Sequence, residues 1–200
     1  GGVRPIGLFT GLLRVFMRAL RRTIGEQWVS KHVPPAWYGV RGKSSEQAVW
    51  ARLAAVRYAK ETGGVALGEL YDVTKAFDHL QLAVVKKWAE RFNFPMILLR
   101  FLFAVYQAPR HFVIGKGMVK RVRPTRSTVA GCAFADLMMF NVMLGIHSQV
   151  VFAAPSAIVA VIADDYQILA TGTSEEAVDT MAKADGAAMR AFAEADLPVS

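Results

Sequence analysis

The chain has 200 residues, of which 54% are hydrophobic and 20% are charged, and its formal net charge is +8. This length suits one domain or part of a larger one, and a chain this apolar can bury a substantial core, which excludes global disorder. The single cysteine, Cys132, excludes an internal disulfide and favours a reducing intracellular compartment, the nucleus or the cytoplasm. The longest apolar run, residues 150–163, is too short to span a bilayer and contains Pro155, so we expect no membrane-spanning segment.

The charge is distributed unevenly along the chain. Residues 1–126 carry 22 Lys and Arg against 7 Asp and Glu, whereas residues 127–200 carry 2 against 9. A basic part joined to an acidic part suggests a polyanion as partner of the first and cations as partners of the second. A plain solvated basic face is the alternative interpretation of the first part.

Residues 4–24 are predicted to form a basic amphipathic helix, because apolar residues recur every three or four positions. The predicted apolar face consists of Phe9, Leu12, Leu13, Phe16, Leu20 and Ile24. The opposite face carries four arginines, and we expect Arg14 and Arg18 among them to contact nucleic-acid phosphates. A membrane-surface helix and a solvated face are the alternatives.

A second helix is predicted after the irregular segment 33–43, in which Pro and Gly break regular structure. Ser44 begins it, and Gln47, three residues later, completes a capping box. Gly63 and Gly64 end it. Its inward apolar stripe is predicted at Val49, Leu53 and Val56.

The rest of the chain alternates between strand-like and helix-like segments. A strand is predicted at 65–72, and helices are predicted at 79–92 and from Pro95 to about 105. A basic hairpin is predicted at 110–123 and an apolar core helix at 133–147. Thr173 and Glu176 make a second capping box, opening a helix to about residue 195. This order is typical of an α+β fold with an antiparallel sheet.

Residues 157–171 contain an apolar β-branched run, two adjacent aspartates and a second apolar run, which predicts a β-hairpin with Asp164 and Asp165 at or beside its turn. Two neighbouring carboxylates repel each other. Water can compensate, because Asp is common in turns, and so can a divalent cation, because hard oxygen ligands suit magnesium. A third carboxylate on a neighbouring strand favours the cation, and Asp72, where the strand at 65–72 ends, is the candidate.

Five motifs follow one another along the chain: Arg-Pro-Ile at 4–6, Tyr-Gly-Val-Arg from residue 38, Asp-Val-Thr-Lys-Ala-Phe-Asp at 72–78, the basic hairpin with the helix after Gly131, and Ala-Asp-Asp at 163–165. Together they resemble the fingers and palm of reverse transcriptases, especially those of retroelements and group II introns. The resemblance implies an α+β fold with a fingers-like part at 1–64, a palm at 65–200 whose antiparallel sheet is flanked by helices, and no thumb.

The activity that the resemblance implies is RNA-directed DNA polymerisation, in which a primer 3′-hydroxyl attacks the α-phosphorus of a dNTP on an RNA template. The DNA primer, the RNA template and the dNTP are then the partners. Two Mg²⁺ or Mn²⁺ ions would be held by Asp72, Asp164 and Asp165. The nucleotide would be contacted by Arg41, Lys43, Val73, Phe77 and Gly131. The nucleic acid would be contacted by Arg14, Arg18, Lys120, Arg121 and Arg123.

The sequence also departs from the family pattern. Ala130 stands where the family has a glutamine that positions template and nucleotide, and we expect neither the family's primer-grip hairpin nor its thumb within these 200 residues. A catalytically silent nucleic-acid-binding remnant of the same fold is therefore the alternative function. An RNA-dependent RNA polymerase palm is a third interpretation, but that class usually places Asp five residues after the first catalytic Asp, where this chain has Phe77.

Overall fold

The computed structural model describes residues 9–111, 113, 114, 117, 118, 121, 123, 124, 126, 128 and 132–200. The chain divides into two compact units, one built from the residues up to 32 and from 77–141, and the other from 33–76 and 142–200. The predicted boundary between fingers and palm, at residues 64 and 65, lies inside the second unit. That functional division stays a prediction.

The second unit contains a four-stranded sheet in the order β1-β5-β6-β2. Strand β2 (Val65–Tyr71) pairs antiparallel with β6 (Asp165–Gly172), and β6 pairs antiparallel with β5 (Ile158–Ile162). The predicted α+β fold with an antiparallel sheet is therefore confirmed. Strand β1 (Trp37–Tyr38), which the sequence did not predict, adds a short parallel edge beside β5.

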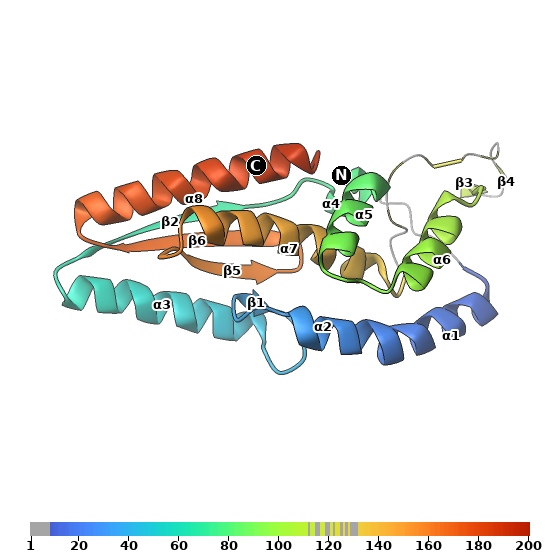
Figure 1. Cartoon of the computed structure of the whole chain (residues 1–200), viewed down its shortest axis with the longest axis horizontal. Helices are drawn as coiled ribbons and strands as arrows, with labels where there is room; N and C mark the ends of the chain where they lie inside the picture. Colours follow the sequence, from blue (N-terminus) through green and yellow to red (C-terminus); the bar gives the residue numbers. More distant parts are fainter. Residues whose placement is uncertain are drawn as a thin grey trace. The chain divides into compact units, whose positions relative to one another are not determined.

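Helix α8 (Ser174–Glu194) covers one face of this sheet (Figure 1). Thr173 and Glu176 form the predicted capping box at its first turn. Tyr71 and Tyr166, which lie opposite each other on β2 and β6, both pack their rings against Phe192 of α8. The buried face of α8 is otherwise mostly alanine, which allows a close approach of helix to sheet: Ala177, Ala184, Ala187, Ala188 and Ala191.

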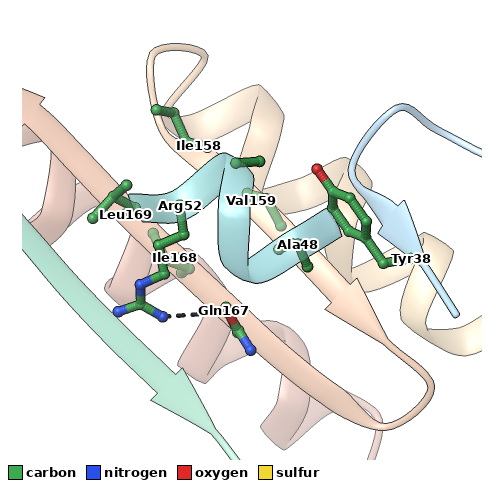
Figure 2. A pocket seen from close by; sticks show the side chains of 10 residues that line it. Tyr38, Ala48, Arg52, Ile158, Val159, Gln167, Ile168 and Leu169 are labelled. Carbon is green, nitrogen blue, oxygen red and sulfur yellow. Dashed lines mark hydrogen bonds between the residues drawn. The ribbon is translucent and has the colours of Figure 1, made fainter. Parts of the chain in front are cut away.

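Helix α3 (Ser45–Glu61) packs on the other face of the sheet (Figure 1). Ser44 and Gln47 make the predicted capping box. Figure 2 shows Arg52 reaching down from α3, and its Nη1 donates to the Gln167 side-chain oxygen on β6 at 3.2 Å. The guanidinium occupies the space that a Cβ at Gly68 would fill. The cavity left between α3 and the sheet measures about 20 Å³, room for about one water and not for a nucleotide.

The predicted inward face of α3 was wrong. The residues that α3 buries are Ala48 and Ala59, whereas Val49 and Leu53 are 54% and 52% exposed and Val56 is exposed too. Hydrophobic periodicity finds an apolar stripe but does not say which stripe meets the sheet. Here the small side chains allow the closer contact, and Gly68 of β2 and Gln167 of β6 accommodate Arg52.

The first unit begins with α1 (Gly11–Leu20), a π-helical turn η1 (Arg21–Gly25) and α2 (Glu26–His32). The helix predicted from residue 4 thus continues beyond residue 24, and residues 4–8 lie outside the described residues. Its predicted apolar face was only partly right, because Met17 is the one residue of α1 that is fully buried and Leu12 is 84% exposed. The Arg21 guanidinium forms an ion pair at 2.9 Å with Asp136, in the first turn of α7.

Helices α5 (Leu82–Arg91) and α6 (Met96–Gln107) complete most of this unit, and the short α4 (Ala76–His79) precedes them. The helix predicted at 79–92 is therefore two helices with a break at residues 80 and 81. Leu82, Val85 and Trp88 of α5 are buried. The Trp28 indole of α2 donates to the carbonyl of Phe92 at 3.0 Å, which joins α2 to the end of α5.

The predicted basic hairpin contains two short paired strands, β3 (Val113–Ile114) and β4 (Gly117–Met118). Helix α7 (Ala135–Ala153) follows and is longer than predicted. By length and composition α7 is apolar enough to cross a membrane, but 67% of its most apolar stretch is buried inside the protein, as in a core helix. In the second unit, His147 of α7 packs edge-on against Trp37 of β1, and burial lowers the pKa of His147 to about 4.

Candidate active site

The aspartate pair lies at the tip of the predicted hairpin. Ile162 at the end of β5 pairs with Asp165 at the start of β6, so Ala163 and Asp164 form a two-residue turn. Ala163 has a φ of 57°, the positive value that the first central position of such a turn requires. Asp164 is half-buried and Asp165 is exposed. The hairpin therefore presents both carboxylates at one end of the sheet.

Asp72 reaches the same end of the sheet from the neighbouring strand. Tyr71, the last residue of β2, lies opposite Tyr166 of β6, so the next positions on the two strands, Asp72 and Asp165, are level with each other. Side chains alternate between the faces of a sheet. Both aspartates therefore lie on the face opposite to the one that Tyr71 and Tyr166 present to α8. The structure thus brings Asp72 and the aspartate pair, which are far apart in sequence, to one end of the sheet, with Asp72 and Asp165 on one face.

The backbone around Asp72 is fixed from its other side by the last residues of the chain. The Asp72 N–H donates to the Ser200 carbonyl at 3.3 Å, and the Ser200 N–H donates to the Asp72 carbonyl at 3.0 Å. Val73, predicted to approach the nucleotide, is buried and bridges to Val199. The sequence did not predict this contact, because residues 197–200 have no strand pattern.

The three carboxylates influence one another electrostatically. Partial burial at the hairpin raises the pKa of Asp165, and the negative charges of Asp164 and then Asp72 raise it further. Repulsion of this kind, which the sequence led us to expect among clustered carboxylates, thus acts on Asp165 together with burial. A divalent cation between these groups would remove the repulsion.

The donor chemistry of this sheet end suits a hard cation, since all three side chains offer carboxylate oxygens. Within the described parts of the chain, however, no three His, Cys, Asp or Glu side chains are arranged to hold a metal ion. The aspartates therefore share a sheet end without forming a closed ligand set, and their role as metal ligands stays a prediction.

A basic loop leaves the sheet beside the hairpin tip. Tyr38 pairs with Ile162 in parallel register, so the chain leaves β1 at the end where β5 turns. Gly39 and Gly42, with φ of 70° and 84°, shape the loop that carries Arg41 and Lys43. Arg41 is exposed, whereas the Lys43 ammonium donates to the Pro35 carbonyl at 2.7 Å and lies 5.7 Å from the Tyr38 ring centroid. Arg41 is therefore the freer cation for an anionic ligand.

The remaining predicted nucleotide contacts are only partly described. Phe77, which belongs to the first unit, is half-buried, and its carbonyl accepts a hydrogen bond from the Thr128 N–H at 3.1 Å. Gly131 lies outside the described residues, as does Ala130, the departure from the family pattern.

The predicted nucleic-acid contacts are mostly exposed arginines. Arg14 and Arg18 lie one turn apart on α1, and together with Met17 and Cys132 they line a cavity of about 120 Å³ in the first unit. Arg121 and Arg123 are exposed as well, and Lys120 lies outside the described residues. These exposed guanidinium groups are available to a polyanion, although nothing in their arrangement selects a particular one.

No protein-family model and no curated protein matches the sequence. Among solved structures, the chain is similar to telomerase from Candida tropicalis in complex with a TWJ fragment of telomeric RNA, with a TM-score of 0.65, 9% identity, and coverage of 95% of this chain and 32% of that chain. The fold is reverse-transcriptase-like. Apo telomerase from the same organism gives a TM-score of 0.59 at 10% identity, covering 94% of this chain and 34% of that one.

Telomerase from Candida albicans in complex with a TWJ fragment of telomeric RNA gives a TM-score of 0.52 at 11% identity, covering 94% of this chain and 32% of that chain. At these identities the similarity establishes the fold alone. The chain spans about a third of the length of these telomerase chains. The similarity supports a polymerase-like fold of the reverse transcriptase kind, without distinguishing the retroelement and group II intron type.

Proposed function

We propose that this chain is the fingers and palm of an RNA-directed DNA polymerase of the retroelement or group II intron type. The observation that carries the proposal is that Asp72 lies level with Asp165, at the end of the sheet where the hairpin turn carries Asp164. The reverse-transcriptase-like fold supports it, because the three residues occupy the strand end and the hairpin tip that their motifs predicted.

The residues at this sheet end divide into an anionic and a cationic group. Asp72, Asp164 and Asp165 would hold two Mg²⁺ or Mn²⁺ ions, which when bound would activate the primer hydroxyl and neutralise charge on the leaving pyrophosphate. Arg41 on the adjacent loop would bind the triphosphate of the dNTP through charge-assisted hydrogen bonds. Lys43 would contribute positive charge while holding the loop on Tyr38.

The RNA template and DNA primer are the proposed partners of the basic residues. Arg14, Arg18, Arg121 and Arg123 are exposed, and guanidinium groups bind phosphate oxygens without regard to base sequence. If binding relies on such contacts, the affinity of the chain for nucleic acid falls steeply as the salt concentration rises.

The second candidate function is a nucleic-acid-binding remnant that has lost turnover. It is favoured by the absence of a closed three-ligand metal set among the described side chains and by Ala130 in place of the family's glutamine. Both functions use the same basic surface to bind nucleic acid. They differ only in whether a bound primer is extended.

Primer extension distinguishes the two functions. The chain would be incubated at low salt with a homopolymer RNA template, a labelled DNA primer, the matching dNTP and Mg²⁺ or Mn²⁺, with binding measured in parallel. Extension that is lost in Asp72→Asn but kept in Asp78→Asn supports the polymerase. Binding without extension supports the remnant, and failure of both binding and extension contradicts both functions.

A further inference from the structure

Helix α3 carries an exposed apolar stripe on the side away from its buried alanines. Val49, Leu53 and Val56 recur at spacings of four and three residues, so they line up along the helix, and Trp50 beside them is also exposed. The face that α3 turns to the sheet is a different one, built on Ala48, Arg52 and Ala59. A continuous apolar stripe of this kind on an otherwise packed helix indicates an interaction surface.

The charged residues at the two ends of the stripe are opposite in sign and placed symmetrically. Glu46 lies seven residues before Leu53, and Lys60 lies seven residues after it. Seven residues are close to two helical turns, so both charges lie on the side of the helix that carries the stripe. Both side chains are exposed. The stripe is therefore acidic at its beginning, mainly apolar along its middle and basic at its end, and the one further charge on this side, Arg57, is paired with Glu61 at 2.7 Å.

A surface with this pattern is complementary to itself in one orientation. If a second copy of α3 lies antiparallel, with a two-fold axis at Leu53, each Glu46 meets Lys60 of the other copy. In the same arrangement Trp50 of one copy lies opposite Val56 of the other, and Leu53 meets its own counterpart. A parallel arrangement would instead place Glu46 against Glu46 and Lys60 against Lys60, which like-charge repulsion disfavours.

We propose that α3 is a self-association surface on which a second copy of this chain docks antiparallel about Leu53. The charge pattern selects a second copy, since each end of the stripe is the electrostatic complement of the other. This symmetric use of one patch by both copies is the isologous contact typical of two-fold dimers. The proposal is independent of the polymerase function, because it uses no residue of the sheet end.

The size of the stripe determines the affinity that we expect for the dimer. With 17 residues α3 is about 25 Å long, and one helix pair falls short of the roughly 1,200–2,000 Å² buried by stable interfaces. The dimer should therefore be weak and reversible, with a dissociation constant on the order of 1–100 µM.

Sedimentation velocity of the whole chain across that concentration range tests the proposal. Leu53→Glu should weaken self-association about tenfold or more, because it places two like charges on the two-fold axis. Phe152→Glu is the matched control, since Phe152 is 90% exposed on α7, outside the stripe, and its replacement should leave association unchanged. A wild-type chain that stays monomeric throughout, or association that Leu53→Glu does not affect, overturns the proposal.

A charge exchange separates specific docking from loss of folding. Glu46→Lys leaves only lysines at the two ends of the stripe, and Lys60→Glu leaves only glutamates, so each variant alone should self-associate more weakly than the wild type. An equimolar mixture should recover association, because both end contacts are then between opposite charges. Recovery requires that both variants are folded. Circular dichroism reports whether the two variants are folded. If both are folded and their mixture associates no better than each variant alone, the antiparallel arrangement is contradicted.

Discussion

Tyr71 and Tyr166 lie directly opposite each other on β2 and β6, with ring centroids 6.2 Å apart, yet only one of their hydroxyls has hydrogen-bond partners among the described residues. The Tyr71 hydroxyl lies 2.9 Å from a Glu69 carboxylate oxygen and 2.7 Å from an Asp185 carboxylate oxygen. The Tyr166 hydroxyl is buried beside them without such a partner. This pair sets the register that brings Asp72 level with Asp165.

Loss of the hydroxyl should change the free energy of unfolding in opposite directions at the two tyrosines. Tyr166→Phe removes a buried unpaired polar group and should raise the free energy of unfolding by about 1 kcal/mol. Tyr71→Phe removes a hydroxyl whose single proton is shared between two carboxylate acceptors and should lower it by about 1.5–3 kcal/mol. Urea unfolding of the two variants measures both changes, and each serves as the control for the other. Equal effects would mean that the Tyr166 hydroxyl is bonded.

Stability should depend on pH through Asp165. Its folded-state pKa is raised by burial and by the charges of Asp164 and Asp72, so its contribution to stability is present below the unfolded-state pKa and is lost as pH rises through the folded-state pKa. Asp165→Asn should therefore have a higher melting temperature than the wild type at neutral pH. The difference should disappear in acid, below the unfolded-state pKa of about 3.9.

Magnesium provides a check on this interpretation of Asp165. Adding the ion at neutral pH should raise the melting temperature of the wild type more than that of Asp165→Asn, since the ion removes repulsion that the variant lacks. Asp179→Asn, at an exposed surface pair with Lys183, is the control. If the melting temperature depends on pH in the same way in the wild type and in Asp165→Asn, the carboxylates do not interact.

Phe77 should select deoxyribonucleotides if the proposed function holds. In the family that this chain resembles, the aromatic residue five positions after the first aspartate lies under the nucleotide sugar, where a 2′-hydroxyl finds no partner. An unpaired buried polar group costs about 1–3 kcal/mol, or roughly 5- to 150-fold in rate. Phe77→Val, measured in a form of the protein that extends primers, should keep dNTP incorporation and raise rNTP incorporation. If both rates fall together, Phe77 has a packing role instead.

Arg14 and Arg18 should contribute to nucleic-acid affinity through counterion release. Replacing either arginine with alanine should weaken binding of every sequence alike and reduce the slope of log K against log salt by about 0.7–0.9. Fluorescence anisotropy with an RNA–DNA hybrid at several salt concentrations gives the slope. Arg190→Ala, on the exposed side of α8, is the control. An unchanged slope in both variants would exclude α1 from the interface.

The features that the sequence predicted well are those with local causes. The capping boxes at Ser44 and Thr173 depend on residues three positions apart, and the hairpin at Asp164 depends on two β-branched runs around a polar pair. The position of Asp72 at the same sheet end as that hairpin also followed from motif order, because both groups end or begin strands.

The features that the sequence did not predict depend on distant partners. Strand β1 has two residues in a segment rich in Pro and Gly, and it becomes a strand only because β5 lies beside it. The inward face of α3 depends on the glycine and glutamine that the sheet presents to Arg52. The contact of Ser200 with Asp72 joins residues 128 positions apart and has no local signal.

The sheet end formed by Asp72, Asp164 and Asp165 should bind divalent cations if the proposed function holds. Titration of Mn²⁺ into the chain, with free Mn²⁺ measured by electron paramagnetic resonance, tests this binding without a primer, a template or a nucleotide. Asp78→Asn, which changes an exposed aspartate of the same motif, is the matched control. We expect binding that Asp72→Asn abolishes and Asp78→Asn leaves intact. Binding that Asp72→Asn does not weaken, or no binding at all, would contradict it.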